Sequence, residues 1–494
     1  MTKALMIALG MGLLAQTAPA QTAAAPAAAA PSAKGVISAA SKAMGIEGLN
    51  SIHFYGVAQN GNIGQNNNSN QPWPMAGAND YVRAIDFTAP ASRATWMNYA
   101  VPVTGGAAAA APGQQNITAQ SPAVQQLEIW ITPWGFLKGA AANNAKLAAS
   151  AAGARTLSFN TPLKSPGGKP YRVVGYLNSQ NLVTRVQTWM DHPVFGDMLV
   201  DTEYSNYRTG ANGLKFPAQI VQKRAGWPFF TAYILGAHAN PANLQALVTP
   251  PPAPGRGGPP AVAGGGQAGA PMTSEKLADG VYRINGAYNA VAIEFADHIV
   301  LFEPGPQNEA RALAVIAETK KVIPDKPIRF GVITHHHIDH TGGLEAAIAE
   351  GITIVTPEVN KKFLVDTFST PRTLAPDALA KSGKKPVVEG FKGDKRVFQD
   401  ATRTLEVHVI KGLPHADGLV IGYLPKEKIL IYADMFNLPP ANDPVPNPPV
   451  VGTGVFVDNI ERLKLEPERV LSIHNLNPDR LTTVAEIKAT LGRK

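Results

Sequence analysis

The sequence contains no cysteine. The chain therefore forms no disulfide, offers no thiolate to a metal ion and has no cysteine for a lipid anchor. Charged residues are also scarce, at 16% of the chain. The formal net charge is +8, but no run of Lys and Arg alternates with aromatic residues. This composition predicts a mildly basic, solvated surface and no nucleic-acid partner.

Long hydrophobic runs are missing as well. The apolar segment Ala4–Ala15 is too short to span a bilayer as a permanent anchor. It lies between Lys3 and the small-residue segment Ala18-Pro19-Ala20, the order typical of a signal peptide. We expect residues 1–20 to direct general secretion. The mature protein is then periplasmic or secreted, with no stable membrane anchor.

Pro and Gly are plentiful but concentrated in a few stretches. Residues 21–33 form an Ala/Pro-rich tail, and residues 249–273 form a Pro/Gly-rich linker. A third biased stretch, 102–122, is expected to be a surface loop. These stretches predict two domains, at 34–248 and 274–494, and leave the oligomeric state open.

The first domain is rich in strand patterns. After a predicted helix at 34–44, the expected strands are SIHFYGVAQ, YVRAIDF, RATWMNY, QLEIWITPW, KPYRVVGYLNSQNLVTRVQTWM, MLVDTEYSNYR and LKFPAQIVQKR. These patterns predict a mainly antiparallel, curved sheet with one sheltered face. Its C-terminal stretch resembles the half-barrel of periplasmic lipoprotein carriers. The histidines of this domain, His53, His192 and His238, lack metal-ligand spacing.

In the second domain, strands and helices alternate around buried apolar runs. VYRING, AVAIEF, HIVLFEPG, RFGVITHH and ITIVTP read as strands, as do RTLEVHVIKG, LVIGYLP, KILIYADMF and RVLSIHN. Helical patterns separate several of them, for example at 307–319 and 343–350. This alternation predicts an α/β fold.

A histidine-rich string directly follows one of these strands. Thr334 to Gly343 reads THHHIDHTGG and precedes a helix. Such a loop lies at the carboxyl end of a strand, where α/β sheets place their ligands. His335 and His337 project from one side of an extended loop, while Asp339 and His340 face the neighbouring position. Imidazole and carboxylate groups are ligands that zinc prefers, so the string predicts a metal site rather than a surface cluster.

Three more candidate ligands occur at strand ends. His415 lies in LPHADG before a strand, Asp434 ends ILIYAD, and His474 ends VLSIH. Each stands beside an apolar run that gives no other reason for an ionisable group. Together with the string, they predict one metal centre.

Residues 274–494 resemble the metallo-β-lactamase superfamily on these motifs. The resemblance implies an αββα sandwich with the metal site at one edge. It implies two divalent ions, expected to be zinc, with a set of seven ligands: His335, His337 and His415 for the first ion, Asp339, His340 and His474 for the second, and Asp434 bridging both. His336 and His408 match no ligand position.

The implied chemistry is hydrolysis of a small-molecule substrate. A water shared by two ions has a lowered pKa and supplies a metal-bridging hydroxide. Asp339 would orient this hydroxide as the catalytic residue. One departure concerns the strand ending FEPGP, where Glu303 stands in place of the common Asp-x-Gly pattern.

Several substrates fit this pattern. β-Lactamases of the superfamily usually lack a carboxylate at the position of Asp434, and one subgroup has a cysteine there. Asp434 instead resembles branches that cleave thioesters, lactones or phosphoesters. We therefore expect an ester, lactone or thioester hydrolase. A β-lactam hydrolase, an iron-dependent sulfur dioxygenase and a periplasmic carrier of an apolar ligand are the alternatives.

Overall fold

The structure is a computed structural model that describes residues 32–99, 111–149, 155–250, 272–437, 449–474 and 480–493. The predicted signal peptide lies outside these residues. So do most of the predicted tail and most of the predicted linker. Within the described residues, no helix is both long and apolar enough to cross a membrane.

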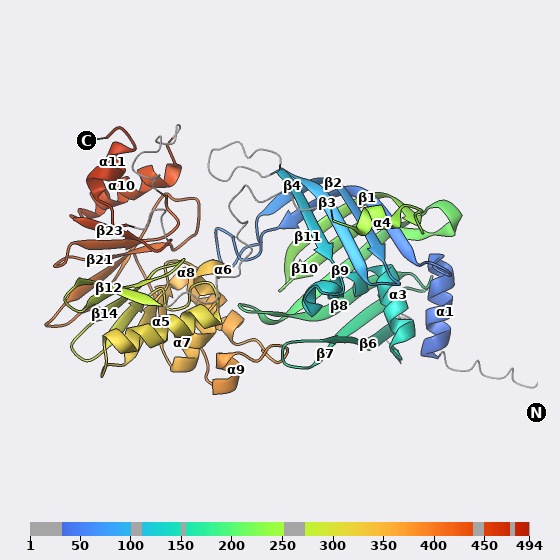
Figure 1. Cartoon of the computed structure of the whole chain (residues 1–494), viewed down its shortest axis with the longest axis horizontal. Helices are drawn as coiled ribbons and strands as arrows, with labels where there is room; N and C mark the ends of the chain where they lie inside the picture. Colours follow the sequence, from blue (N-terminus) through green and yellow to red (C-terminus); the bar gives the residue numbers. More distant parts are fainter. Residues whose placement is uncertain are drawn as a thin grey trace, which may run out of the picture.

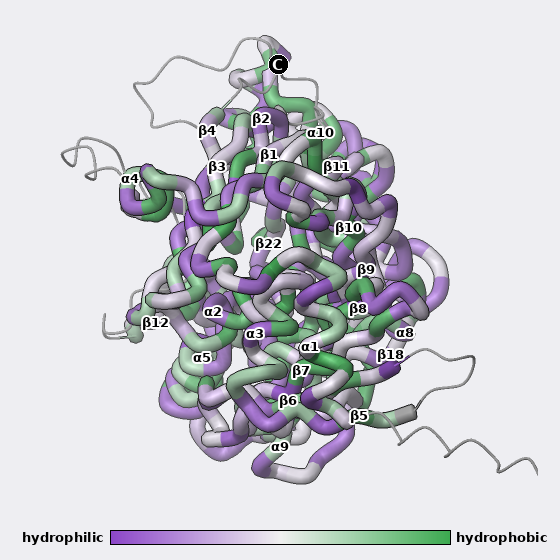
Figure 2. Tube along the Cα trace, turned by 90° about the vertical axis from the view of Figure 1, so that its right-hand side faces the viewer, coloured by the Kyte–Doolittle hydropathy of each residue, from purple (hydrophilic) through white to green (hydrophobic). Residues whose placement is uncertain are grey.

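The N-terminal half is built on one eleven-stranded antiparallel sheet, in the order β4-β3-β2-β1-β11-β10-β9-β8-β7-β6-β5. Apolar and polar residues alternate along many of its strands (Figure 2). The sheet confirms the predicted antiparallel domain. Its strands are β1 (Ser51–Gly61), β2 (Met75–Asp86), β3 (Ala91–Tyr99), β4 (Ala111–Ile117), β5 (Lys146–Ala149), β6 (Arg155–Lys164), β7 (Pro170–Leu177), β8 (Val183–His192), β9 (Gly196–Thr209), β10 (Lys215–Arg224) and β11 (Trp227–Ala239).

Helices pack on the sheltered face of this sheet. The ring of Trp134 lies 5.5 Å from that of Phe54 between centroids, and Gly175 leaves room for the ring of Phe136. These large aromatic side chains are buried and form the core between helix and sheet. The helices are α1 (Ala33–Met44), α2 (Ala123–Trp130), α3 (Pro133–Ala142), the 3₁₀ turn η2 (Ala211–Gly213) and α4 (Leu244–Val248).

Two sequence predictions for this half are wrong. QLEIWITPW is not a strand but belongs to α2 and α3, because Thr132 caps α3 by accepting the backbone N–H of Gly135, and Pro133 takes the first helical position. The expected loop at 102–122 contains strand β4, which pairs with β3.

The C-terminal half contains two sheets. One has seven strands: β12 (Thr273–Ala278), β13 (Val281–Asn285), β14 (Ala290–Glu294), β15 (Ile299–Phe302), β16 (Ile328–Val332), β17 (Thr353–Pro357) and β18 (Val388–Phe391). The other has five: β19 (Lys395–Gln399), β20 (Thr404–Val409), β21 (Val420–Leu424), β22 (Ile429–Tyr432) and β23 (Arg469–Ser472). The middle strands β15, β21 and β22 are fully buried because both of their faces are covered.

The two sheets pack face to face, and helices cover their outer faces (Figure 1). Phe302 and Val407 belong to the apolar core between the sheets, whereas Phe456 of α10 packs against the five-stranded sheet. This layering is the predicted αββα sandwich. Its helices are α5 (Glu309–Val322), α6 (Ile338–Thr341), α7 (Leu344–Glu350), α8 (Glu358–Phe368), α9 (Ala378–Ser382), α10 (Val451–Leu463) and α11 (Val484–Ala489).

Among the described residues, the two halves contact each other through several segments. The connection between β1 and β2 lies against the histidine string, as described below. The buried guanidinium of Arg372 donates from Nη1 to the carbonyl of Pro193, at 2.8 Å, and from Nη2 to that of Val194, at 2.7 Å. Hydrogen bonds to backbone carbonyls fix the contact at Arg372 in one geometry.

Candidate metal centre

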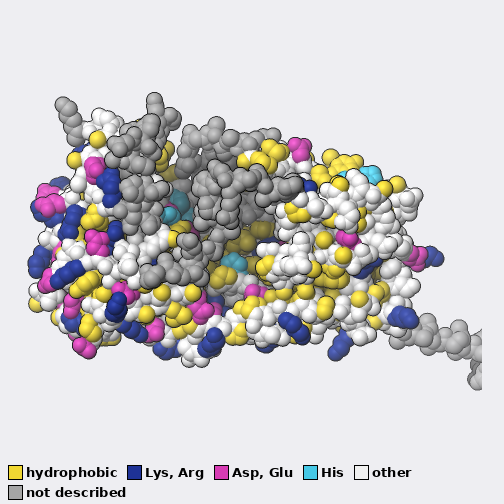
Figure 3. All heavy atoms as spheres, in the orientation of Figure 1, with side chains coloured by type: hydrophobic (Ala, Val, Ile, Leu, Met, Phe, Trp, Pro, Cys, Tyr) yellow, Lys and Arg dark blue, Asp and Glu magenta, His cyan; other side chains and the backbone are white. Residues whose placement is uncertain are grey.

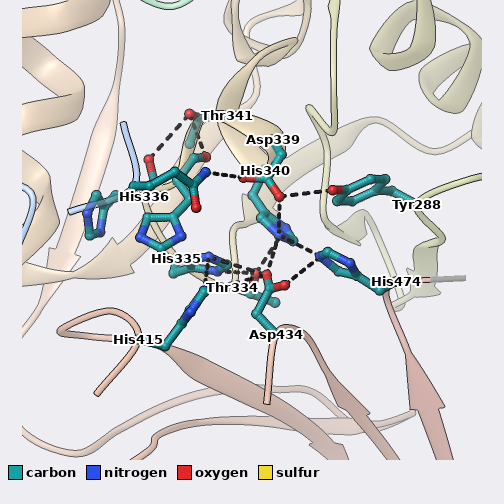
Figure 4. A network of polar contacts seen from close by, with 12 residues as sticks. Tyr288, Thr334, His335, His336, Asp339, His340, Thr341, His415, Asp434 and His474 are labelled. Carbon is teal, nitrogen blue, oxygen red and sulfur yellow. Dashed lines mark hydrogen bonds and ion pairs between the residues drawn. The ribbon is translucent and has the colours of Figure 1, made fainter. Parts of the chain in front are cut away.

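The candidate ligands gather where the strand ends of both sheets meet (Figure 4). Histidine side chains are visible in the hollow between the two halves of the molecule (Figure 3). The seven predicted residues come from five segments: His335 and His337 follow β16, Asp339 and His340 lie in α6, His415 precedes β21, Asp434 follows β22, and His474 follows β23. The structure brings all seven together in two groups that could each hold a metal ion.

The first group consists of His335, His337 and His415. The Nε2 atoms of His335 and His415 are 3.3 Å apart. The ring of His337 lies 4.5 Å from the rings of both others, between centroids. Three imidazoles that converge at this distance can bind one ion through a nitrogen each.

The second group consists of Asp339, His340, Asp434 and His474. Nε2 of His340 lies 3.2 Å from Nε2 of His474 and 3.6 Å from Oδ2 of Asp339. Asp434 lies between the groups: its Oδ1 is 2.7 Å from His474, and its Oδ2 is 2.6 Å from His340 and 3.3 Å from His335. One carboxylate thus reaches both groups.

The titration of these histidines reflects their surroundings. Burial lowers the pKa of His415 and, together with the neighbouring His336, lowers the pKa of His337 to about 3. Burial and the charge of His340 hold the pKa of His335 well below its ordinary value. These three imidazoles are therefore neutral near pH 7, the form that binds metal ions.

His340 differs from the other three. Burial alone would lower its pKa, but the carboxylates of Glu303 and Asp434 raise it well above the ordinary value. The reciprocal charge of His340 outweighs burial at Asp434 and holds the pKa of this carboxyl well below its usual range. Asp434 is therefore ionised at neutral pH. A divalent ion that binds here would displace the proton from Nε2 of His340.

The residues present fit a divalent metal. Oδ2 of Asp434 is buried and lies 2.6 Å from Nε2 of His340 and 3.3 Å from Nε2 of His335, so one carboxylate oxygen faces a nitrogen of each group. Imidazole nitrogens that converge around buried carboxylate oxygens form the donor set that a divalent ion such as zinc prefers. Asp434 also holds a φ of 52°, a backbone conformation that clusters at functional sites.

Glu303 supports the second group from behind. It is fully buried, and its Oε2 lies 2.9 Å from Nδ1 of His340, while Oε1 accepts the backbone N–H of Thr334 at 2.6 Å. A carboxylate that holds Nδ1–H of an imidazole leaves Nε2 directed at the metal position. The longer Glu at this position thus contacts a candidate ligand directly, which explains how the departure from Asp-x-Gly is accommodated.

Two groups at this site were not predicted from the sequence. The hydroxyl of Tyr288 donates to Oδ2 of Asp339 at 2.9 Å (Figure 4), and Nε2 of Gln65 donates to Oδ1 at 3.0 Å. Tyr288 lies in the short connection between β13 and β14, and Gln65 lies in the N-terminal half. No spacing rule points to either residue, because neither adjoins the histidine string in sequence.

The remaining histidines lie outside the two groups. His336 is buried and turns away from the ligands toward Phe363 and the N-terminal half. His408, in β20, contacts Glu406 at 2.8 Å. In the described part of the chain, neither of the two groups includes an N-terminal histidine.

Residues 283–470 match the family model described as "Metallo-beta-lactamase superfamily". The C-terminal domain therefore belongs to this superfamily. This membership and the two His/Asp groups support divalent metal binding and an enzyme of the metal-dependent hydrolase type. A search of curated proteins finds no match to the chain.

Solved structures similar to the chain include two metallo-beta-lactamases, from Pontibacter korlensis and Hirschia baltica. Both are 18% identical and cover 45% of this chain and 97% of their own, with TM-scores of 0.34 and 0.33. The metallo-beta-lactamase FIM-1 from Pseudomonas aeruginosa, in its mono-zinc form, is 16% identical, covers 45% of this chain and 94% of its own, and has a TM-score of 0.32.

Proposed function

We propose that this protein is an exported binuclear metallohydrolase that cleaves an ester, lactone or thioester bond in a small molecule. One observation carries the proposal: the carboxylate of Asp434 lies within 2.7 Å of nitrogens of His340 and His474 and 3.3 Å from that of His335. A carboxylate shared by two ligand groups is the arrangement expected of a bridging ligand between two ions.

In this proposal the first ion is held by His335, His337 and His415. The second is held by Asp339, His340 and His474, and Asp434 joins them. When bound, the ions, expected to be zinc, lower the pKa of a shared water to supply a nucleophile and polarise the substrate oxygen.

The residues around the ions have their own roles. Asp339 receives hydrogen bonds from Tyr288 and Gln65 on its two oxygens, which fixes the plane of its carboxylate. The catalytic role of Asp339 is to orient the attacking hydroxide by accepting a hydrogen bond from it. Glu303 keeps His340 in the tautomer that presents Nε2.

The test combines metal analysis with a substrate panel. Purified protein is expected to contain two equivalents of a divalent metal and to hydrolyse lactones or thioesters in a panel that also contains phosphoesters and β-lactams. A double variant, His335→Ala with His337→Ala, should lose both properties while remaining folded. Faster turnover of β-lactams would favour the β-lactam hydrolase, and bound iron with sulfur oxidation would favour the dioxygenase. Absence of any bound metal would refute the proposal.

A second candidate function, binding of an apolar ligand, is favoured by a cavity of about 310 Å³ on the sheltered face of the N-terminal sheet. Its walls combine the aromatic side chains of Phe54, Tyr81, Trp96 and Phe230 with the charged side chains of Arg83, Glu128 and Arg224. Cavities of this size, lined by aromatic side chains, bury small ligands effectively. Native mass spectrometry of the intact protein should retain a lipid-like adduct if the cavity is a carrier site. In that case the protein would hydrolyse no substrate in the panel.

A further inference from the structure

One N-terminal segment reaches the metal centre. The bridging loop, residues 62–74, connects β1 and β2 and lies against the histidine string. The backbone carbonyl of Asn66 accepts from Nε2 of His336 at 2.8 Å and from Nε2 of His337 at 3.1 Å. Because a carbonyl can only accept a hydrogen bond, the Nε2 atom of His336 and the Nε2 atom of His337 must each carry a proton. Nδ1 of His337 is then the nitrogen left for a metal ion.

The next contact acts on a ligand of the second group. The side-chain amide of Gln65 donates to Oδ1 of Asp339 at 3.0 Å, opposite the hydroxyl of Tyr288 on Oδ2. An N–H donor fixes one oxygen of a carboxylate and leaves its other lone pairs for a metal ion. Successive residues of the bridging loop therefore contact one candidate ligand of each group.

The bridging loop is fitted closely to this position. Gly64 has a φ of +68°, and a Cβ on it would lie 2.1 Å from Cγ2 of Ile338, the residue between His337 and Asp339. The side chain of Asn66 donates to the carbonyls of Asn68 and Gln71, at 2.6 and 2.8 Å. The loop thus holds its own shape while Gly64 allows it to approach α6.

Further along, the same loop holds the segment that carries His415. The carbonyl of Asn67 accepts the backbone N–H of Asp417, and the side chain of Asn68 donates to Oδ2 of Asp417 at 2.9 Å. The side chains of Ser69 and Asn70 both donate to one carbonyl in α8. The contacts therefore extend over three separate segments of the C-terminal domain.

From these contacts we infer that the bridging loop is part of the metal centre. Gln65 is a positioning residue for Asp339, and the Asn66 carbonyl sets the tautomer of His337. The inference rests on the proposed metal function and assigns the N-terminal domain a direct role in it. Loss of a hydrogen-bond partner that orients a metal ligand typically lowers metal affinity ten- to a hundredfold.

The experiment measures zinc affinity of the full chain by competition with a chromophoric chelator. Gln65→Met keeps the length of the side chain and removes the donor, and Gly64→Ala forces the loop away from Ile338. Asn62→Ala is the matched control, because Asn62 lies on the same loop and its side chain is exposed. Thermal unfolding checks that each variant is folded.

We expect Gln65→Met and Gly64→Ala to weaken binding of zinc by about tenfold or more, and Asn62→Ala to bind as the wild type does. The visible spectrum of the cobalt-substituted protein should change in Gln65→Met as well. Wild-type zinc affinity and an unchanged cobalt spectrum in Gln65→Met would overturn the role of the loop, whatever the fate of Gly64→Ala. A wild-type protein that binds no metal would instead overturn the proposed function.

Discussion

Replacing Glu303 by Gln tests how the metal centre is supported. The carboxylate accepts two hydrogen bonds on separate oxygens, from the backbone of Thr334 and from Nδ1 of His340. Gln has the same shape but only one acceptor oxygen. If that oxygen faces Thr334, the amide N–H₂ faces His340 and favours the tautomer with a proton on Nε2. If it faces His340, two donors oppose each other at Thr334.

Either arrangement weakens the second ligand group. Removing a carboxylate that holds a metal ligand typically lowers metal affinity ten- to a hundredfold. The expected loss of binding free energy is therefore about 1.4–2.7 kcal/mol. Glu303 contacts His340 of the second group. The affinity for the second ion should therefore fall more than the affinity for the first. The assay is stepwise zinc competition with a chelator, followed by the unfolding midpoint of each variant.

Glu294→Gln is the control for this change. Glu294 ends β14 and pairs with Lys326 at 2.7 Å, away from both ligand groups. The Glu294→Gln variant should bind both ions with the affinity of the wild type. If Glu303→Gln also binds both zinc ions with wild-type affinity, the orientation of His340 by Glu303 is refuted.

Three further predictions concern the charge and metal dependence of the protein. Asp434→Asn should lose one equivalent of metal and at least about a hundredfold in kcat/KM, measured on any substrate found in the panel, because the bridging charge is removed. Dialysis against a chelator should lower the thermal midpoint, since free zinc at 100 times its Kd adds about 2.7 kcal/mol to stability; an unchanged midpoint would argue against metal binding. Burial raises the pKa of Glu345 to about 8 from 4.5, so the wild type should lose stability as pH rises between these values. The free energy of unfolding of Glu345→Gln, measured in urea, should depend less on pH than that of the wild type. Relative to the wild type, the variant should be more stable at pH 8.5 than at pH 4 by about 4 kcal/mol. Parallel pH profiles of the two proteins would contradict this.

Much of the C-terminal domain could be predicted from the sequence because local pattern and tertiary environment agree there. Ile429–Tyr432 is apolar throughout and is buried on both faces. Six of the seven ligands follow a strand, and His415 precedes β21, which runs antiparallel to β22, so their convergence at one edge follows from strand direction. The assignment of each ligand to a particular ion stays a prediction.

The N-terminal half was harder to predict for a physical reason. Residues 126–134 are too short and too apolar for periodicity to distinguish a strand from a buried helix. The capping signal at Thr132 and Pro133 was the better guide. Gln65 lies in a polar, Asn-rich loop, and its partner Asp339 is 274 positions away. No local pattern carries information over that separation.

That separation has a consequence for folding. The contact between Gln65 and Asp339 forms only after both domains have folded and the chain between them has closed a long loop, which is entropically costly and slow. A freshly folded C-terminal domain would offer histidines without the Asn66 carbonyl that selects their protonated nitrogens. We therefore expect maturation of the proposed metal centre to depend on domain docking. The rate at which refolding protein acquires tightly bound zinc should follow docking rather than formation of the sandwich.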